Sequence, residues 1–348
     1  MGVPLAVGAV SPRTVIVMLR IGILSAASIA PGALVEPARV VDGVEVTAVA
    51  ARDRRRAEEF ADRHGIANVL DSYSALCGSD VVDAVYICTP ATLHHQWTLA
   101  ALAAGKHVLC EKPLAANAVE AAEMVAAGVA ADRVMMEAFH WKYHPMAARI
   151  RAICADELGS IEHIEASFTI GHLTNRAIQF DLSLGGGSLM DLGVYPLQWV
   201  RWVAQAEPTI LSAHAVCDPP GLDLQMDADL RFGDVGAGVT AHIHSSMQPG
   251  GPMGATLDVR GSRGSLRVVN PLAPQMGNSL TVVVGDQSRT EEVERSSTYE
   301  HQLRAFVAAV ASGQPPLTGG ADAIATMTAV DAIYRAAGLS PRGVSVSR

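Results

Sequence analysis

The sequence predicts an α/β protein in two parts, a doubly wound parallel sheet followed by an α+β domain that contains an antiparallel sheet. Two observations support this prediction. From Leu19 to Glu137, short runs of β-branched residues alternate with longer patterns of helical period, which is typical of a parallel sheet covered by helices. After Phe139, strand-like runs follow one another with few helices between them, which is typical of antiparallel pairing.

The first half carries the alternating pattern. Its strands are expected at Leu19–Leu24, Val44–Ala50, Ala84–Cys88, His107–Cys110 and Val134–Glu137. Its helices are expected at Arg54–His64, His95–Ala104 and Asn117–Ala127. Asn117 is a good N-cap for the last helix, because Glu120 stands three residues after it.

The second half is dominated by strands. These are expected at Ile161–Ile170, Thr209–Val216, Leu224–Phe232, Gly236–Ser245, Ala255–Arg260, Ser265–Val269 and Leu280–Val284. Helices are expected at Asp191–Ala204, Tyr299–Ala311 and Ala321–Ala336. We therefore expect a dinucleotide-binding domain at residues 18–140 and a substrate-binding domain at 141–348. Residues 1–17 show no domain-like pattern and are expected to be disordered or non-native.

Composition excludes several classes of protein. With 348 residues, 49% of them hydrophobic and 18% charged, the chain has ample material for packed cores. A net charge of −9 argues against a nucleic-acid surface, because such a surface must be basic to displace counterions from phosphate. The apolar stretch 14–35 is interrupted by Arg20 and Pro31, so we expect neither a membrane span nor an export signal.

The cysteines point to a reducing compartment. They are five in number and scattered, without a CxxC pair or other zinc-ligand spacing, at positions 77, 88, 110, 154 and 217. We expect buried, reduced thiols and a cytoplasmic protein.

The run Cys110-Glu111-Lys112-Pro113 is the most informative motif, because it follows a predicted buried strand. Loops at the carboxyl ends of parallel strands line the ligand crevice of such sheets. Only three of the 26 basic residues are lysines, so a lysine here indicates a task that needs a compact, titratable ammonium. We interpret Lys112 as a catalytic candidate and expect Glu111 and Lys112 to face the cofactor. The alternative is a solvated loop cation.

The turn after the first strand predicts a nucleotide site. Its residues Gly22, Ser25, Ala27, Ser28 and Ile29 occupy the place where dinucleotide folds bind a diphosphate. Ser25 and Ala27 replace the usual glycines, so an ordinary strand-turn-helix with small residues remains an alternative. Backbone N–H groups at the following helix N-terminus would still bind phosphate.

Two further segments bear on the cofactor. Arg52 follows the second strand where NAD-selective enzymes place an acid, which favours NADP over NAD. The alternative is a solvated helix start with Asp53 as its N-cap. After the third strand, Thr89, Pro90 and His94 are expected on the nicotinamide side.

The block Gly185–Tyr195 supplies the second group of catalytic candidates. If the block is helical, Asp191 and Tyr195 are one turn apart on one face. Pro196 removes a helical hydrogen bond, so we expect an irregular turn there. The alternatives are a helix cap for Asp191 and a core residue for Tyr195.

Together these motifs resemble the Gfo/Idh/MocA oxidoreductase family, named after glucose-fructose oxidoreductase and inositol dehydrogenase. The similar features are Gly22, Thr89-Pro90, Glu111-Lys112-Pro113, Met136–Phe139, Gly185–Tyr195 and Tyr299-xx-Gln302-Leu303. The chain is most similar to the dihydrodiol dehydrogenase and NADP-linked sugar dehydrogenase branch. This resemblance implies a Rossmann domain, Lys112, Asp191 and Tyr195 as the catalytic group, and an open sheet face used for forming dimers or tetramers.

The expected reaction is hydride transfer between NADP, or alternatively NAD, and a carbinol or carbonyl group. Tyr195 would exchange the hydroxyl proton, and Lys112 at ~4–6 Å would lower the tyrosine pKa by favouring phenolate. Asp191 would anchor substrate hydroxyls or hold Lys112 protonated. Other candidate substrate ligands are His94, Lys142, His172 and Asn175, although each of these is individually more typical of a structural residue.

No metal is expected. His242 and His244 share a strand face, but no third ligand at suitable spacing is evident. The leading hypothesis is an oxidoreductase acting on a sugar, polyol or dihydrodiol. A dinucleotide-binding sensor without turnover is the alternative, and an enzyme that retains its nucleotide while cycling between two sugars is a third possibility.

Overall fold

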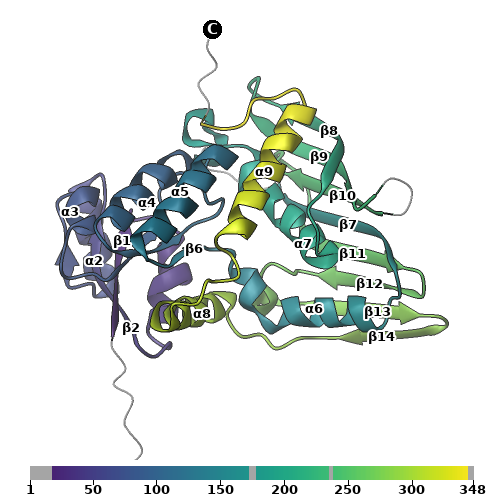
Figure 1. The fold of residues 1–348 in the computed structure, drawn as a ribbon, viewed down its shortest axis with the longest axis horizontal. Helices are drawn as coiled ribbons and strands as arrows, with labels where there is room; N and C mark the ends of the chain where they lie inside the picture. Colours follow the sequence, from purple (N-terminus) through teal and green to yellow (C-terminus); the bar gives the residue numbers. More distant parts are fainter. Residues whose placement is uncertain (1–17, 172–177, 235–237, 344–348) are drawn as a thin grey trace, which may run out of the picture.

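The computed structural model describes residues 18–171, 178–234 and 238–343, and it contains two sheets (Figure 1). The predicted disorder of residues 1–17 and the expected ligands His172 and Asn175 lie outside these ranges. The first sheet has six parallel strands in the order β3-β2-β1-β4-β5-β6. Its strands are β1 (Leu19–Leu24), β2 (Val44–Ala50), β3 (Asn68–Val69), β4 (Ala84–Ile87), β5 (His107–Cys110) and β6 (Met135–Glu137). This order confirms the doubly wound Rossmann fold.

Helices cover both faces of this sheet. They are η1 (Pro31–Val35), α1 (Glu36–Ala38), α2 (Arg54–His64), α3 (Tyr73–Cys77), η2 (Ala91–Leu93), α4 (His94–Ala103) and α5 (Ala118–Ala131). Asn117 caps α5 as predicted, since its side chain accepts hydrogen bonds from the N–H groups of Val119 and Glu120. The sequence interpretation missed β3 and α3, which are too short for their periodicity to be read.

The second sheet has eight strands in the order β14-β13-β12-β11-β7-β10-β9-β8. They are β7 (Ile161–Ile170), β8 (Thr209–Cys217), β9 (Asp223–Phe232), β10 (Val239–Ser246), β11 (Met253–Gly261), β12 (Gly264–Val269), β13 (Ser279–Val284) and β14 (Gln287–Glu291). The expectation of antiparallel pairing is correct except in the centre, where β7 and β10 run parallel. A helical crossover and the β8–β9 hairpin separate these two strands in the chain.

Helices pack on one face of the second sheet. The helix α7 (Val194–Ala204) contacts β7 and β10, and α9 (Ala321–Ala336) contacts β8. The helix α6 (Pro145–Asp156), which the sequence interpretation missed, packs beside α7. The opposite face carries polar side chains such as His242 and His244.

The two halves are joined by elements from the end of the chain. The helix α8 (Thr298–Ser312) packs on the first domain, where Leu303 and Phe306 share a core with Ile21 of β1. At the C-terminal side, the Arg342 guanidinium donates to the carbonyl of Gly186 (2.9 Å), and its own carbonyl accepts from Asn117 (3.1 Å). Contacts between the domains therefore come from segments far apart in sequence.

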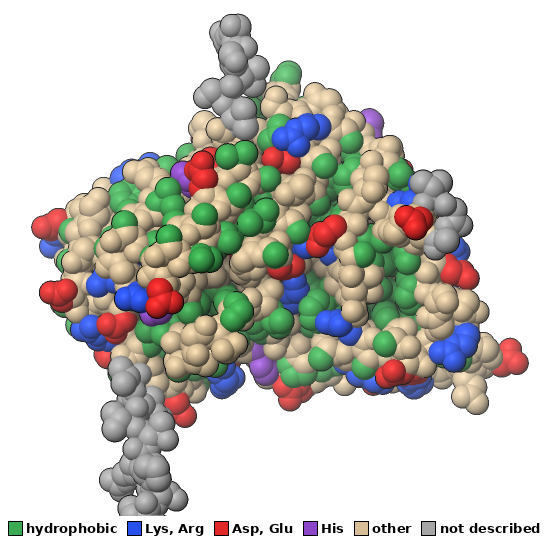
Figure 2. Space-filling model, viewed as in Figure 1, with side chains coloured by type: hydrophobic (Ala, Val, Ile, Leu, Met, Phe, Trp, Pro, Cys, Tyr) green, Lys and Arg blue, Asp and Glu red, His purple; other side chains and the backbone are tan. Residues whose placement is uncertain are grey.

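The described surface is mixed in charge. On the face drawn in Figure 2, acidic and basic side chains are interspersed. Among the described residues, no helix combines the length and the apolar composition that a membrane crossing requires.

Candidate active site

Lys112 and Asp191 meet between the two domains, as the sequence predicts. The Lys112 ammonium donates a hydrogen bond to the Asp191 carbonyl oxygen (2.7 Å) and another to its Oδ1 (3.2 Å). Both side chains line a small cavity of about 70 Å³ at the carboxyl edge of the parallel sheet. A paired ammonium in a partly enclosed cavity can bind and polarise the oxygen of a ligand.

Tyr195 lies beside the lysine but is deeply packed. The Lys112 ammonium is 5.2 Å from the centre of its ring, and the ring packs edge-on against Phe139 and Phe168. Only 5% of Tyr195 is exposed, and it does not line the 70 Å³ cavity. Of the three expected catalytic residues, two therefore face the cavity and the third lies behind the lysine.

The net shift in the pKa of Tyr195 is upward, whereas the sequence interpretation expected Lys112 to lower it. Burial raises the pKa of Tyr195 well above its usual value, and the nearby carboxylates of Glu111 and Asp191 raise it further. Removal from water disfavours the charged phenolate, and so does the negative charge of the neighbouring carboxylates. Tyr195 is therefore a neutral phenol at physiological pH, which suits a proton donor.

The turn that carries Asp191 is irregular, as the position of Pro196 predicts. Residues Leu189–Gly193 form a single π-helical turn, η6, and the α-helix begins only at Val194. The proline thus falls in the first turn of α7, where its missing N–H is tolerated. Before the turn, the Leu189 N–H donates to the buried carboxylate of Asp223 (2.7 Å), which fixes the start of η6.

His94 lines the cavity beside Lys112 and is held against two backbone carbonyl groups. Its Nδ1 lies 2.9 Å from the carbonyl oxygen of Pro113, and its Nε2 lies 2.8 Å from that of Thr89. The ring is 1% exposed, and its burial lowers the pKa. The neutral ring can donate to only one of these carbonyl oxygens, and it lies between the loop after β4 and the loop that carries Lys112.

The nucleotide turn has the backbone shape of a phosphate site. Ser25 adopts φ +96°, the left-handed region that explains why glycine is usual at this place. Among the described residues, the N–H groups of Ser28 and Ile29 have no backbone acceptor. Gly22 has a packing role instead, since a Cβ there would lie 2.7 Å from the Leu76 side chain.

Arg52 is exposed directly after β2. Asp53 caps α2 by accepting hydrogen bonds from the N–H groups of Arg55 and Arg56, so the capping alternative is confirmed for this aspartate. Within the described part of the chain, Arg52 has no ion pair, in contrast to Arg54, which pairs with Glu58. The guanidinium of Arg52 is therefore available to a ligand.

Lys142 is directed away from the cavity beside Lys112. Its buried ammonium donates to Asp322 (2.8 Å) and Gln198 (3.2 Å) and lies over the ring of Trp202. These contacts correct the expectation that Lys142 binds substrate. A helix at the end of the chain supplies Asp322, and local sequence does not reveal such a partner.

Sequence reasoning did not assign His140 to the site, and it named Tyr299 only as part of a family motif. His140, 4% exposed, stacks on Tyr299 with ring centres 4.1 Å apart, and its ring lies 6.1 Å from that of Tyr195. Its Nδ1 is 2.8 Å from the Thr298 hydroxyl. Burial, assisted by the charge of Lys112, lowers the pKa of His140 to about 3. The only available signal was its position directly after Met136–Phe139.

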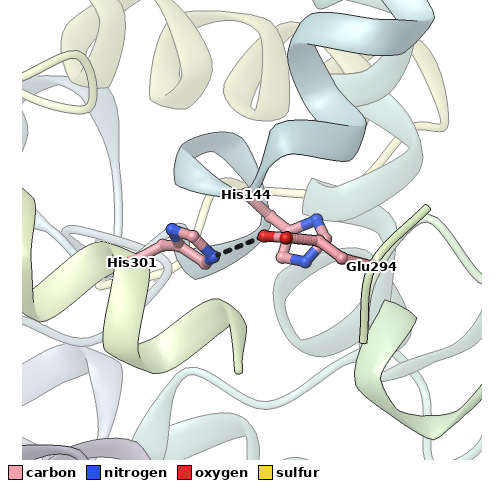
Figure 3. Close-up of side chains that lie close together, drawn as sticks. All are labelled: His144, Glu294 and His301. Carbon is pink, nitrogen blue, oxygen red and sulfur yellow. Dashed lines mark ion pairs between the residues drawn. The ribbon is translucent and has the colours of Figure 1, made fainter. Parts of the chain in front are cut away.

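One cluster resembles a metal site without being one. Suitable ligand atoms of His144, Glu294 and His301 lie within 4.8 Å of one another, and Figure 3 shows His301 facing Glu294. However, His144 Nδ1 accepts the Met146 N–H, so the neutral ring carries its proton on Nε2, the nitrogen that faces the cluster. The Ser296 hydroxyl lies 3.3 Å from this Nε2 and 2.8 Å from that of His301. A metal-binding histidine instead donates its other N–H outward.

The histidines of β10 pair with acids. His242 lies 2.9 Å from Asp229, and His244 lies 2.7 Å from Asp227. The carboxylates of Asp227 and, to a lesser extent, Asp229 raise the pKa of His242 to about 9. They form a charged cluster on the open face of the second sheet.

Family models match most of the chain. The model described as "Oxidoreductase family, NAD-binding Rossmann fold" matches residues 19–139, and the "GFO/IDH/MocA C-terminal domain" matches residues 146–267. The chain belongs to the GFO/IDH/MocA oxidoreductase family. The resemblance inferred from the sequence motifs is therefore confirmed.

Relatives within this family include enzymes named for sugars and dihydrodiols. The chain is 33% identical to D-xylose 1-dehydrogenase (NADP(+)) 2 of Haloferax volcanii, with 91% of this chain and 96% of the relative covered. It is 35% identical to trans-1,2-dihydrobenzene-1,2-diol dehydrogenase of Sus scrofa, covering 65% and 67%. The 3-ketoreductase KijD10 of Actinomadura kijaniata, solved with NADP and TDP-benzene, superposes with a TM-score of 0.85 at 28% identity, covering 92% and 98%.

Proposed function

We propose that this protein is an NADP-dependent oxidoreductase that interconverts a carbinol and a carbonyl group on a sugar, polyol or dihydrodiol. The observation that carries the proposal is the Lys112 ammonium, which Asp191 holds in a cavity at the carboxyl edge of the Rossmann sheet. In doubly wound sheets this edge is where ligands bind. The names of the family relatives support the same class of reaction.

The residues of the nucleotide turn fit NADP. The N–H groups of Ser28 and Ile29 are available for a diphosphate, and Arg52 is available for a 2′-phosphate. Thr89 and Pro90, with Glu111, lie around the nicotinamide side of the same edge. When bound, the nicotinamide supplies or accepts the hydride. NAD is the weaker candidate, because Ala51 stands where NAD-selective enzymes place the acid that binds ribose hydroxyls.

In the proposed reaction, side chains of the protein would stabilise the charge on the substrate oxygen and transfer a proton to it. Lys112 would donate a hydrogen bond to the substrate oxygen and stabilise negative charge that develops there during reduction. Tyr195, as a neutral phenol behind Lys112, would give the proton that converts this oxygen to a hydroxyl, which requires its ring to move toward the cavity when substrate binds. Asp191 would hold the ammonium in place. The high pKa of the phenol favours carbonyl reduction at neutral pH.

Binding and turnover test the proposal separately. NADPH should quench the tryptophan fluorescence of the purified protein, and NADH should do so more weakly. A panel of sugars, polyols, dihydrodiols and their carbonyl forms should then change the absorbance of the reduced nicotinamide. Nucleotide binding without turnover across the panel would favour the alternative of a sensor, and nucleotide that persists through purification would mark the cycling enzyme.

We also propose a cytoplasmic homo-oligomer, a dimer or tetramer. The polar open face of the second sheet carries no helix among the described residues, and all five cysteines are free thiols. Sedimentation would measure the oligomeric state, and a charge reversal at His242 should weaken the association.

A further inference from the structure

A buried tyrosine of the Rossmann sheet contacts the residue that precedes Lys112. Tyr86 lies on β4 and is fully buried, and its hydroxyl donates a hydrogen bond to Oε1 of Glu111 (2.5 Å). The other carboxyl oxygen of Glu111, Oε2, accepts the backbone N–H of Lys112 (3.3 Å). Glu111 therefore connects the neighbouring strand to the backbone of the proposed catalytic lysine.

These two contacts fit an ionised carboxyl group. Among the described residues, the Tyr86 hydroxyl donates only to Glu111, and the backbone N–H of Lys112 can act only as a donor. Both contacts thus use Glu111 as an acceptor. An ionised carboxyl group is acceptor-only, whereas a protonated one must place a hydrogen on one of its two oxygens. Hydrogen bonds to a charged acceptor are also the stronger ones.

The charge of Glu111 depends on the tyrosine, because burial opposes it. Burial raises the pKa of Glu111 above its usual value, and the charge of Asp191 adds to the rise. Among the interactions that act in the opposite direction, the hydrogen bond from Tyr86 comes first, ahead of the charge of Lys112. Removing the tyrosine hydroxyl should therefore favour the neutral form of Glu111.

Other ionisable side chains surround this carboxylate. Its charge acts on thiols and phenols of β4 and the loop after it, of β5, and of α7 and α8, namely Tyr86, Cys88, Cys110, Tyr195 and Tyr299. Burial raises the pKa of each of these groups, so all are uncharged near neutral pH. The charges that act on Glu111 are then those of Lys112 and Asp191. Lys112 thus lies between two carboxylates, with Glu111 at its backbone N–H and Asp191 at its ammonium.

We propose that Tyr86 is a positioning residue that holds Glu111 as a carboxylate, and that this carboxylate fixes the backbone of Lys112 for the reaction. Tyr86 acts through Glu111, because it lies in the core and does not line the cavity beside Lys112. The fixed backbone lets the ammonium reach both Asp191 and the substrate oxygen. This inference rests on the proposed oxidoreductase function and adds a residue that supports its lysine.

The variant Tyr86→Phe tests the proposal, because it removes the hydroxyl and keeps the ring in the core. Glu111 should then bind its proton at higher pH than in the wild type. Carbon-13 NMR of protein labelled at the glutamate carboxyl groups measures this titration without nucleotide, and Glu111→Gln identifies the signal. In carbonyl reduction, kcat should fall about tenfold through loss of a charge-assisted hydrogen bond, with little change in NADPH affinity. The loss of rate on the acid side of the pH profile should begin at higher pH.

Two further variants separate this role from a loss of packing. Tyr143→Phe is the matched control, because it removes a tyrosine hydroxyl that bonds the Thr318 hydroxyl (2.8 Å), and it should leave the Glu111 titration and the pH profile unchanged. Glu111→Gln removes the ionisation itself. The shift caused by Tyr86→Phe should therefore be absent when both substitutions are combined.

Three results would overturn the proposal. One is a Glu111 titration that is the same in wild type and Tyr86→Phe. Another is a shift of the pH profile that persists in the double variant. The third is an acid-side loss of rate that remains in Glu111→Gln alone, which decides the question even if Tyr86→Phe does not fold. A shifted Glu111 titration in a protein without turnover would refute the proposed function while supporting the hold of Tyr86 on Glu111.

Discussion

The ammonium of Lys112 bonds both the backbone oxygen and the side chain of Asp191, a residue 79 positions later in the chain. One residue belongs to the Rossmann half and the other to the second half. The position of the lysine therefore depends on how the two halves pack. A change at their contact surface should alter chemistry before it alters nucleotide binding.

Replacing Lys112 with alanine should lower turnover by about 10²- to 10⁴-fold, because the substrate oxygen loses its positioned cation. Affinity for NADPH should change little. Steady-state kinetics and fluorescence titration measure the two quantities. Lys106→Ala is the matched control, since this ammonium donates only to backbone carbonyls of Ser79 and Val82. Normal turnover in Lys112→Ala would remove this residue from the mechanism.

The rate of carbonyl reduction should not fall with the ionisation of Tyr195 between roughly pH 7 and 9, because its pKa lies well above the usual value of ~10. The neutral phenol is the proton donor, so the donor is fully populated over this range. A pH–rate profile of wild type and Tyr195→Phe measures this. A rate loss centred near neutral pH that disappears in Tyr195→Phe would show that Lys112 does lower the tyrosine pKa.

Arg52→Ser should weaken NADPH binding by about tenfold through loss of a charge-assisted phosphate contact, and it should leave NADH binding unchanged. Arg55 lies in the first turn of α2, three residues after Arg52, and pairs only loosely with Glu59 at 3.8 Å, so Arg55→Ser is the control. Fluorescence titrations with NADPH and with NADH measure the two affinities for each variant. Equal losses for NADPH and NADH would contradict the assignment of Arg52 to the 2′-phosphate.

His94→Ala should lower turnover about tenfold or more and also lower the unfolding temperature, because two loops lose their shared anchor. A displaced Lys112 should reduce kcat more than it changes the affinity for nucleotide. The neighbouring His95 pairs with Glu123 on the surface, so His95→Ala should be nearly silent. Unchanged kcat in His94→Ala would show that the clamp does not position the lysine.

Glu137 should make the protein less stable at higher pH. Burial raises the pKa of this carboxyl to about 8, and its Oε1 accepts the N–H of Leu114 (2.7 Å). The folded pKa lies above the unfolded value of ~4.3, so the stabilising contribution is complete below that pH and is lost as pH rises towards 8.

The substitution Glu137→Gln keeps the acceptor and removes the ionisation. Relative to wild type, this variant should gain about 3.5 kcal/mol in free energy of unfolding between roughly pH 5 and 8. Urea unfolding at the two pH values measures the gain. A constant difference between variant and wild type would mean that Glu137 does not titrate in this range.

Long, regular segments were predictable from the sequence. The ranges of β1, β2, β5, β7, α2 and α9 agree with the predictions to the residue, because each has a clear hydrophobic period. The parallel pairing of β7 with β10 was not predictable. These strands are neighbours in the sheet although they are not consecutive in the chain, and sequence patterns do not reveal which distant strands pair. The helix α6 was missed although His144 caps it, because a histidine N-cap is an unusual signal.

The candidate site also has a part that was predictable from the sequence and a part that was not. Local motifs located Lys112 and Asp191, because loops at the carboxyl edge of a parallel sheet converge wherever that sheet forms. The tertiary structure decided which way each polar side chain turns. Lys142 points to Asp322, and His94 lies between two carbonyl groups. The direction of each side chain depends on a hydrogen-bond partner that comes from a distant segment of the chain. Only the tertiary structure brings such partners together, because buried polar groups must be paired with whatever lies near them in space.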